Sequence, residues 1–130
     1  MAGTNKKFTL RARLRSFVFA GRGLFYVLKN EHNIRIQMAI GLAVIGLGIL
    51  FKISRLHWIL AMLCMGLVIS AETMNTALEK LTDKVSPHAS KDAGLVKDIA
   101  AGAVLVATIT AVIVGLLIFI PYVAAWIRQW

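Results

Sequence analysis

Several kinds of residue on which soluble folds commonly depend are scarce in this sequence. Cysteine occurs once, as Cys64, so the chain can form neither an intramolecular disulfide nor a thiolate metal site. Only 16% of the residues are charged, whereas 58% are hydrophobic. This balance is far from that of an average soluble domain. A lipid bilayer therefore suits the chain better than water as its main solvent.

The sequence also lacks the short motifs that mark familiar nucleotide and zinc sites. It contains no glycine-rich Walker loop and no HRD or DFG segment, so any nucleotide site must be of another type. The histidines are His32, His57 and His88. Their spacing does not fit a set of zinc ligands, and we expect no zinc site.

Long apolar stretches predict three membrane-spanning helices. A span needs about 20 largely apolar residues, and residues 99–127 contain no charged side chain. Residues 36–51, in which Gln37 is the one strongly polar residue, and residues 57–71 are shorter candidates. We expect transmembrane helices at about residues 34–51, 57–80 and 98–121. The alternative, a soluble helical bundle, would leave too few polar residues to coat three such helices.

Residues 8–31 predict an amphipathic helix at the membrane surface, because apolar side chains recur at helical spacing beside a basic stripe. The apolar residues are Leu10, Leu14, Phe17, Leu24, Phe25 and Leu28, and the basic residues are Arg11, Arg15, Arg22 and Lys29. A basic face beside an apolar face favours an interfacial position. Packing of this helix on the transmembrane bundle is an equally open interpretation.

Basic residues predict the orientation of the spans. Eight Lys and Arg precede the first span, two lie between the first and second spans, and four lie between the second and third. The positive-inside rule then places the N-terminus and the 80–98 connection, where Pro87 and Gly94 predict a loop or turn, in the cytoplasm. The net charge of +9 is explained by topology and anionic lipid, so we expect no nucleic-acid partner.

No cleavable signal peptide is expected, because the first 33 residues contain no continuous apolar run of the required length. We expect the N-terminus to be retained and residues 1–130 to form a single domain.

Acidic residues gather at the predicted cytoplasmic edge of the membrane. They are Glu31, Glu72, Glu79, Asp83, Asp92 and Asp98. A helix of 3.6 residues per turn places several polar side chains on one face, namely Glu72, Asn75, Thr76, Glu79 and Asp83. Carboxylate and amide oxygens on one face suit Mg²⁺ and phosphate chemistry, and Lys97 and Asp98 add charged groups at the same depth. A salt-bridged, solvated helix end is the alternative interpretation.

The segment ETMNTALEKLTD, followed fourteen residues after Asp83 by Lys97 and Asp98 and then by AAGAVL, closely resembles the prokaryotic diacylglycerol kinase and undecaprenol kinase family. The NEHNIRI segment, the three spans and the IPY ending extend the resemblance over nearly the whole chain. The resemblance implies an all-α membrane protein with an N-terminal amphipathic surface helix and three transmembrane helices. It also implies a homotrimer in the bacterial inner membrane, with active sites formed between subunits near the cytoplasmic face.

By the same resemblance, the enzyme would use ATP and Mg²⁺ to phosphorylate the hydroxyl of a membrane lipid alcohol. Glu72 would be the catalytic base and Asn75 would orient the site, while Glu31 and Glu79 would hold the Mg²⁺ bound to ATP. The remaining nucleotide contacts would come from Lys97, Asp98, His88, Ala89 and Ser90, with support from Asp83. Phe19 stands where some members place a tyrosine near the nucleotide, which leaves it a stacking contact without a hydroxyl.

The identity of the acceptor stays open between undecaprenol and 1,2-diacylglycerol, and overall likeness favours undecaprenol. A hypothesis from another class is a non-catalytic membrane assembly or stress protein built on the same scaffold. That hypothesis predicts the loss of Glu72, Glu79 or Lys97, and all three are present.

Overall fold

The computed structural model describes residues 8–130, which form four α-helices joined by short connections. The helices are α1 (Leu10–Asn30), α2 (His32–Leu50), α3 (Arg55–Val85) and α4 (Lys91–Ile127). Helices α2, α3 and α4 are each long and apolar enough to cross a membrane. The predicted all-helical membrane fold with three long apolar helices is therefore confirmed.

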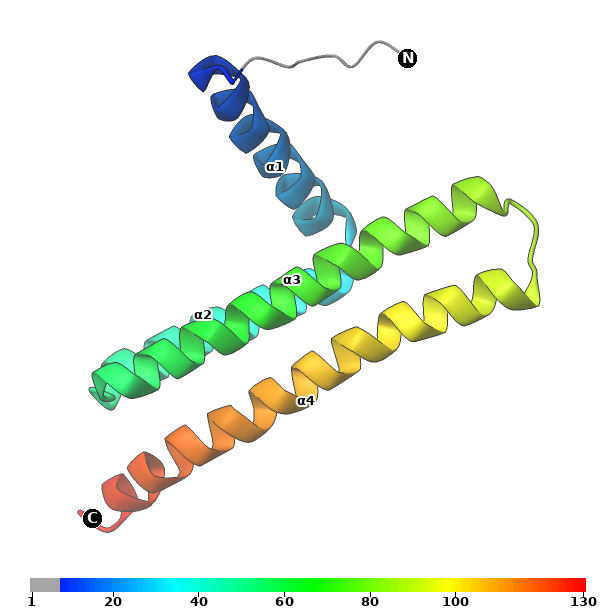
Figure 1. Ribbon diagram of the computed structural model, residues 1–130. Coiled ribbons are helices and arrows are strands. Elements are labelled where there is room, and N and C mark those ends of the chain that lie inside the picture. The colour runs from blue at the N-terminus through cyan, green and yellow to red at the C-terminus, as the bar shows by residue number, and fades with distance from the viewer. Residues whose placement is uncertain (1–7) are drawn as a thin grey trace.

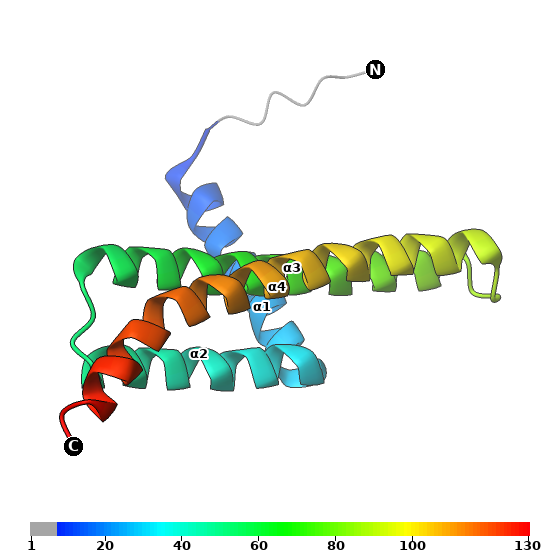
Figure 2. The ribbon, with the colours of Figure 1, turned by 90° about the horizontal axis from the view of Figure 1, so that it is seen from below.

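Helices α3 and α4, the two longest helices, form an antiparallel hairpin (Figure 1). The side chains buried between the helices are small or branched and apolar, such as Ala61 and Val68 on α3 and Ala100 and Ala107 on α4. Small residues allow two helix backbones to approach closely. Helix α2 lies beside the N-terminal half of α3, so the C-terminal half of α3 extends beyond it (Figures 1 and 2).

The turn between α2 and α3 is compact and is held by the end of α4. Lys52 takes a positive φ of 49°, and Ser54 caps α3 by accepting a hydrogen bond from the His57 amide at 3.3 Å. Tyr122 of α4 accepts a hydrogen bond from the Ser54 amide at 3.2 Å, and its hydroxyl lies 2.9 Å from His57 Nδ1. The turn and α4 are thereby tied together at this end of the bundle.

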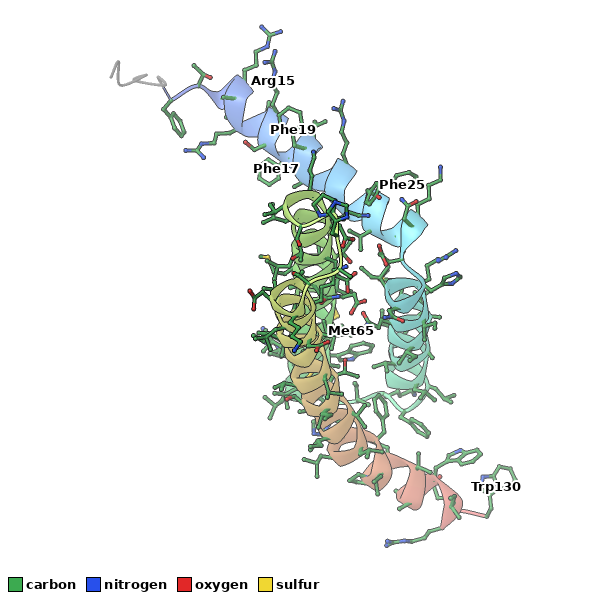
Figure 3. The ribbon with its side chains drawn as sticks, turned by 90° about the vertical axis from the view of Figure 1, so that its right-hand side faces the viewer. Arg15, Phe17, Phe19, Phe25, Met65 and Trp130 are labelled. Carbon is green, nitrogen blue, oxygen red and sulfur yellow. The ribbon has the colours of Figure 1, made fainter. Side chains whose placement is uncertain are left out.

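Helix α1 leaves the bundle at a sharp break. Glu31 is extended, with φ −104° and ψ 122°, and so ends α1 and precedes α2 directly. Val27 is the buried residue of α1, and the rest of the helix projects away from α3 (Figure 1). Phe17, Phe19 and Phe25 lie on this projecting helix (Figure 3). Contact with the bundle is therefore limited to the last turns of α1.

Helices α3 and α4 continue past the segments predicted to span the membrane. At about 1.5 Å per residue, 31 residues measure roughly 46 Å, more than the roughly 30 Å of a bilayer core. The predicted 80–98 connection is therefore mostly helical, and only residues 86–90 separate the two helices. Pro87 lies in this connection, but the expectation of a turn at Gly94 was wrong. Ser90 caps α4 by accepting a hydrogen bond from the Ala93 amide at 3.1 Å, so the helix has already begun before Gly94.

Large apolar side chains cover the outside of all four helices, including Leu42, Leu63, Ile99 and Leu117. A water-soluble monomer rarely exposes contiguous apolar surface on this scale. Lipid or further protein chains must therefore surround α2, α3 and α4.

Candidate functional site

A buried carboxylate lies where α2 meets the middle of α3. Glu72 is 3% exposed, although the preceding residues 58–71 of α3 are apolar apart from Ser70. Its Oε2 accepts a hydrogen bond from Gln37 Nε2 of α2 at 3.4 Å. Burying an ionisable group is costly unless it has polar partners, so this pairing is a distinctive feature of the interface between α2 and α3.

The next turn of α3 continues the polar surface. Asn75 is 9% exposed and Thr76 is 3% exposed, and Asn75 Nδ2 donates a hydrogen bond to Glu79 Oε1 at 3.2 Å. We call Gln37, Glu72, Asn75, Thr76 and Glu79 the carboxylate–amide cluster. Its α3 members share one face, as the helical spacing predicts. The last residue of the predicted stripe, Asp83, lies outside the buried part because α3 has by then passed the end of α2.

Asp83 instead forms an ion pair with Lys97, which joins α3 to α4. The two side chains are 64% and 39% exposed, respectively. An ion pair with this exposure adds little to stability. Its consequence is positional, because it holds the Lys97 ammonium beside the α3 surface that leads to Glu79.

Glu31 lies at the break between α1 and α2. It is half-buried, and its carboxylate is near enough to Lys80 of α3 to attract the ammonium group. The Lys80 ammonium also lies 4.8 Å from the centre of the Tyr26 ring, a cation–π contact that attaches the end of α1 to α3. The Tyr26–Lys80 contact therefore attaches the end of α1 to α3 at the residue that follows Glu79.

The other predicted nucleotide residues lie apart from the buried cluster. His88, Ala89 and Ser90 are exposed in the connection between α3 and α4, and Asp98 is exposed on α4. Phe19 is exposed on α1, and the Arg22 guanidinium lies 5.7 Å from the centre of its ring. Within one chain the structure therefore does not bring these residues together with Glu72.

The oxygen donors of the cluster, together with the Glu31 carboxylate, are of the chemical type that a hard divalent cation binds. Carboxylates of Glu31 and Glu79 are suitable ligands for Mg²⁺, and Asn75 Oδ1 is a buried acceptor that receives no hydrogen bond from residues 8–130. Across the same residues, no three His, Cys, Asp or Glu side chains form a group that could hold a metal ion by themselves. Mg²⁺ at this place would therefore need further oxygen ligands, such as phosphates and water.

An apolar groove of about 610 Å³ runs between α2, α3 and α4. Gln37, Ile69 and Thr108 line the end near the cluster, and Leu47 and Phe119 line the opposite end. Met65, near the middle, lies between α2 and α3 (Figure 3). The groove is apolar along its length, so it suits a hydrocarbon chain, and it has a polar group at one end.

These features define a class of protein: a helical membrane protein with three apolar helices and a buried carboxylate–amide cluster beside an apolar groove. The sequence matches the family described as prokaryotic diacylglycerol kinase over residues 18–119. The chain belongs to this family, whose members are lipid phosphotransferases. The resemblance deduced from the residues is thereby confirmed.

Two relatives carry the names of lipid kinases. The chain is 38% identical over 107 residues to the undecaprenol kinase of Bacillus subtilis. The aligned region covers 82% of this chain and 87% of the relative. It is also 38% identical over 107 residues to the diacylglycerol kinase of Synechocystis. That aligned region covers 82% of this chain but 61% of the relative.

In the sequence, Gln37 stands out only as a polar residue within a predicted span, and that position indicates no role for it. The helical spacing within α2 does not show which residue of α3 lies opposite. The available signal was the strong polarity of Gln37 in a 16-residue apolar stretch, because such residues usually face a polar partner inside a bundle.

Proposed function

We propose that the protein is an ATP-dependent kinase that transfers the γ-phosphoryl group to the hydroxyl of a membrane lipid alcohol. The observation that carries the proposal is the buried Glu72 carboxylate, which lies next to Gln37 at the polar end of an apolar groove. A lipid tail in or beside such a groove would leave its hydroxyl near a carboxylate that can accept a proton.

Glu72 acts as the general base. The lipid oxygen attacks the γ-phosphorus while its proton passes to a Glu72 oxygen, and the bond from the γ-phosphorus to the bridging oxygen breaks to release ADP. Phosphoryl transfer depends mainly on positioning and on neutralising charge. A base therefore need only be close to the hydroxyl and protected from water, and the 3% exposure of Glu72 supports this role.

Glu31 and Glu79 would hold the Mg²⁺ that accompanies ATP, with Asn75 orienting Glu79 through its hydrogen bond. When bound, the ion would neutralise negative charge on the phosphates. Lys97 would pair with the phosphates from the opposite side, and Asp83 keeps this ammonium in place. Asp98, the connection formed by His88, Ala89 and Ser90, and the ring of Phe19 would supply the remaining nucleotide contacts.

The same proposal includes an assembly and an orientation. A homotrimer would cover the exposed apolar faces of the helices and could bring one chain's Asp98 and connection to the cluster of another chain. Helix α1 would lie on the cytoplasmic surface, where its basic side chains meet anionic lipid. The active site would then face the cytoplasm at the inner membrane.

Undecaprenol is the preferred acceptor, and diacylglycerol is the second candidate. The support is the extent of the likeness: the chain spans 87% of the undecaprenol kinase but 61% of the diacylglycerol kinase at equal identity. The deciding experiment is phosphate transfer from γ-labelled ATP to each lipid in detergent micelles, with and without Mg²⁺. We expect labelled lipid only with Mg²⁺, and faster labelling of undecaprenol.

Glu72→Gln should lower turnover by roughly 10²- to 10⁴-fold, the usual scale for a general base, while ATP still binds. Asp92→Asn makes the same chemical change at an exposed carboxylate in the first turn of α4, and it should retain the original turnover. Full turnover in Glu72→Gln would remove Glu72 from the mechanism. Absence of labelled lipid in the unaltered protein would favour the non-catalytic assembly or stress protein.

A further inference from the structure

Gln37 is the polar residue of α2 that contacts the buried carboxylate. Its Nε2 donates to Glu72 Oε2 at 3.4 Å. Its Oε1 is buried and receives no hydrogen bond from residues 8–130. The amide thus offers Glu72 a donor and, on the same planar group, an acceptor that has no other partner among residues 8–130.

We propose that Gln37 is a positioning residue for Glu72 that binds it in both of its protonation states. The inference rests on the proposed function, because it gives Gln37 a part in the proton transfer of that reaction. Before transfer, Gln37 Nε2 holds the carboxylate by donating a hydrogen bond. After transfer, the new Glu72 hydroxyl donates to Gln37 Oε1.

The chemistry of the two groups favours this exchange. A carboxylate only accepts hydrogen bonds, so it uses the amide N–H. A carboxylic acid also donates one, so it can pair with the amide through two antiparallel hydrogen bonds, N–H to C=O and O–H to C=O. A buried acceptor without a partner is costly, and the transferred proton supplies the missing donor for Oε1.

The transfer step moves one proton and one phosphoryl group. The lipid O–H bond breaks and its proton joins a Glu72 oxygen, while a bond forms between the lipid oxygen and the γ-phosphorus. The bond from the γ-phosphorus to the bridging oxygen breaks, and ADP keeps the electron pair. When the proton later leaves Glu72 for water, the carboxylate returns to the single hydrogen bond with Gln37 Nε2.

The contact can be tested without measuring activity, because the chain contains two glutamines, Gln37 and Gln129. Protein labelled with ¹⁵N-glutamine in micelles should give two side-chain amide signals. Glu72→Met should move the signal of Gln37 and leave that of Gln129 in place. An unmoved Gln37 signal would overturn the contact, whether or not the protein proves to be a kinase.

The role is tested by kinetics with Gln37→Met, which keeps the length of the side chain but removes both polar atoms. We expect kcat to fall by about tenfold or more, the scale of one hydrogen bond to a charged group, with an unchanged KM for ATP. As a control, Thr110→Val removes a hydroxyl that bonds to its own helix at the Val106 carbonyl, and its kcat should stay the same.

A double variant separates positioning from a purely structural effect. If Gln37 acts through Glu72, Gln37→Met should cause no further loss in a Glu72→Gln background, because residues that act as a unit are non-additive. Equal losses in both backgrounds would overturn the proposal, as would an unaltered kcat in the single variant. If the unaltered protein transfers no phosphate, the proposed function fails, and the amide signals alone then decide the contact.

Discussion

Carboxylates of the same chemical type have different surroundings in this protein because α3 passes from the bundle into solvent along its length. Glu72 is buried and meets an amide, whereas Asp83, three turns later, is exposed and meets an ammonium. Buried polar groups need partners with fixed geometry, and exposed ones have water as an alternative. Burial therefore separates a group suited to proton transfer from one suited to holding a cation in place.

The role of the ion pair between Lys97 and Asp83 can be tested by replacing a single side chain. Lys97→Met should change the free energy of unfolding by less than roughly 1 kcal/mol, because both partners are exposed. The same change should raise KM for ATP by about tenfold or more through the loss of a charge-assisted hydrogen bond to phosphate. Chemical unfolding and steady-state kinetics measure the two effects. An unaltered KM would show that Lys97 does not bind the nucleotide.

The packing of α2 on α3 depends on positions without a side chain. A Cβ at Gly48 would lie 2.7 Å from Trp58 Cη2 and 3.1 Å from Ile53 Cδ1. A Cβ at Gly41 would lie 3.1 Å from Met65 Sδ. Because helices in a membrane associate through close packing, these glycines determine how near α2 can come to α3, and hence whether Gln37 can reach Glu72.

Gly48→Ala and Gly46→Ala form a matched pair for this element. The first should lower the melting temperature in detergent, because the Trp58 indole must move away from the new methyl group. The second should keep or raise the melting temperature, since a Cβ at Gly46 meets nothing within 4 Å and alanine favours a helix by up to about 1 kcal/mol. Equal melting temperatures for the two variants would contradict the observed packing.

Three of the four helices are long and apolar enough to cross a membrane. A membrane-spanning α3 would have its two ends on opposite sides of the membrane. The connection at residues 86–90 is the end near the proposed active site, and Ser54 lies at the other end. Lys and Arg are concentrated on the side of the membrane where residues 86–90 lie. The positive-inside rule assigns this side to the cytoplasm.

Because Cys64 is the single cysteine, orientation can be measured by thiol labelling in a Cys64→Ser background. Ser54→Cys should react with a membrane-impermeant reagent added to intact cells. Ser86→Cys should react only after the cells are permeabilised. The opposite pattern would place the proposed active site on the outer face and would exclude a supply of ATP from the cytoplasm.

Local patterns in the sequence were sufficient to predict the three long apolar helices and the protein family. Hydrophobic runs predict three long apolar helices because burying such surface in lipid does not depend on which residues lie opposite. Helical spacing likewise predicts that Glu72, Asn75 and Glu79 share a face, and the motif around them identifies the lipid kinase family. The limits of the connection between α3 and α4 were less predictable, because charged residues form a helix beyond the membrane as readily as a loop.

Contacts between helices were decided only by the tertiary structure. The pairing of Gln37 with Glu72 joins residues 35 positions apart, the ion pair of Lys97 with Asp83 bridges two helices, and the contact of Tyr26 with Lys80 attaches α1 to α3. Helical periodicity specifies the face on which a residue lies but not the rotation or offset of the neighbouring helix. The rotation and offset of a helix depend on close packing at positions such as Gly48. This packing exists only once the helices have assembled.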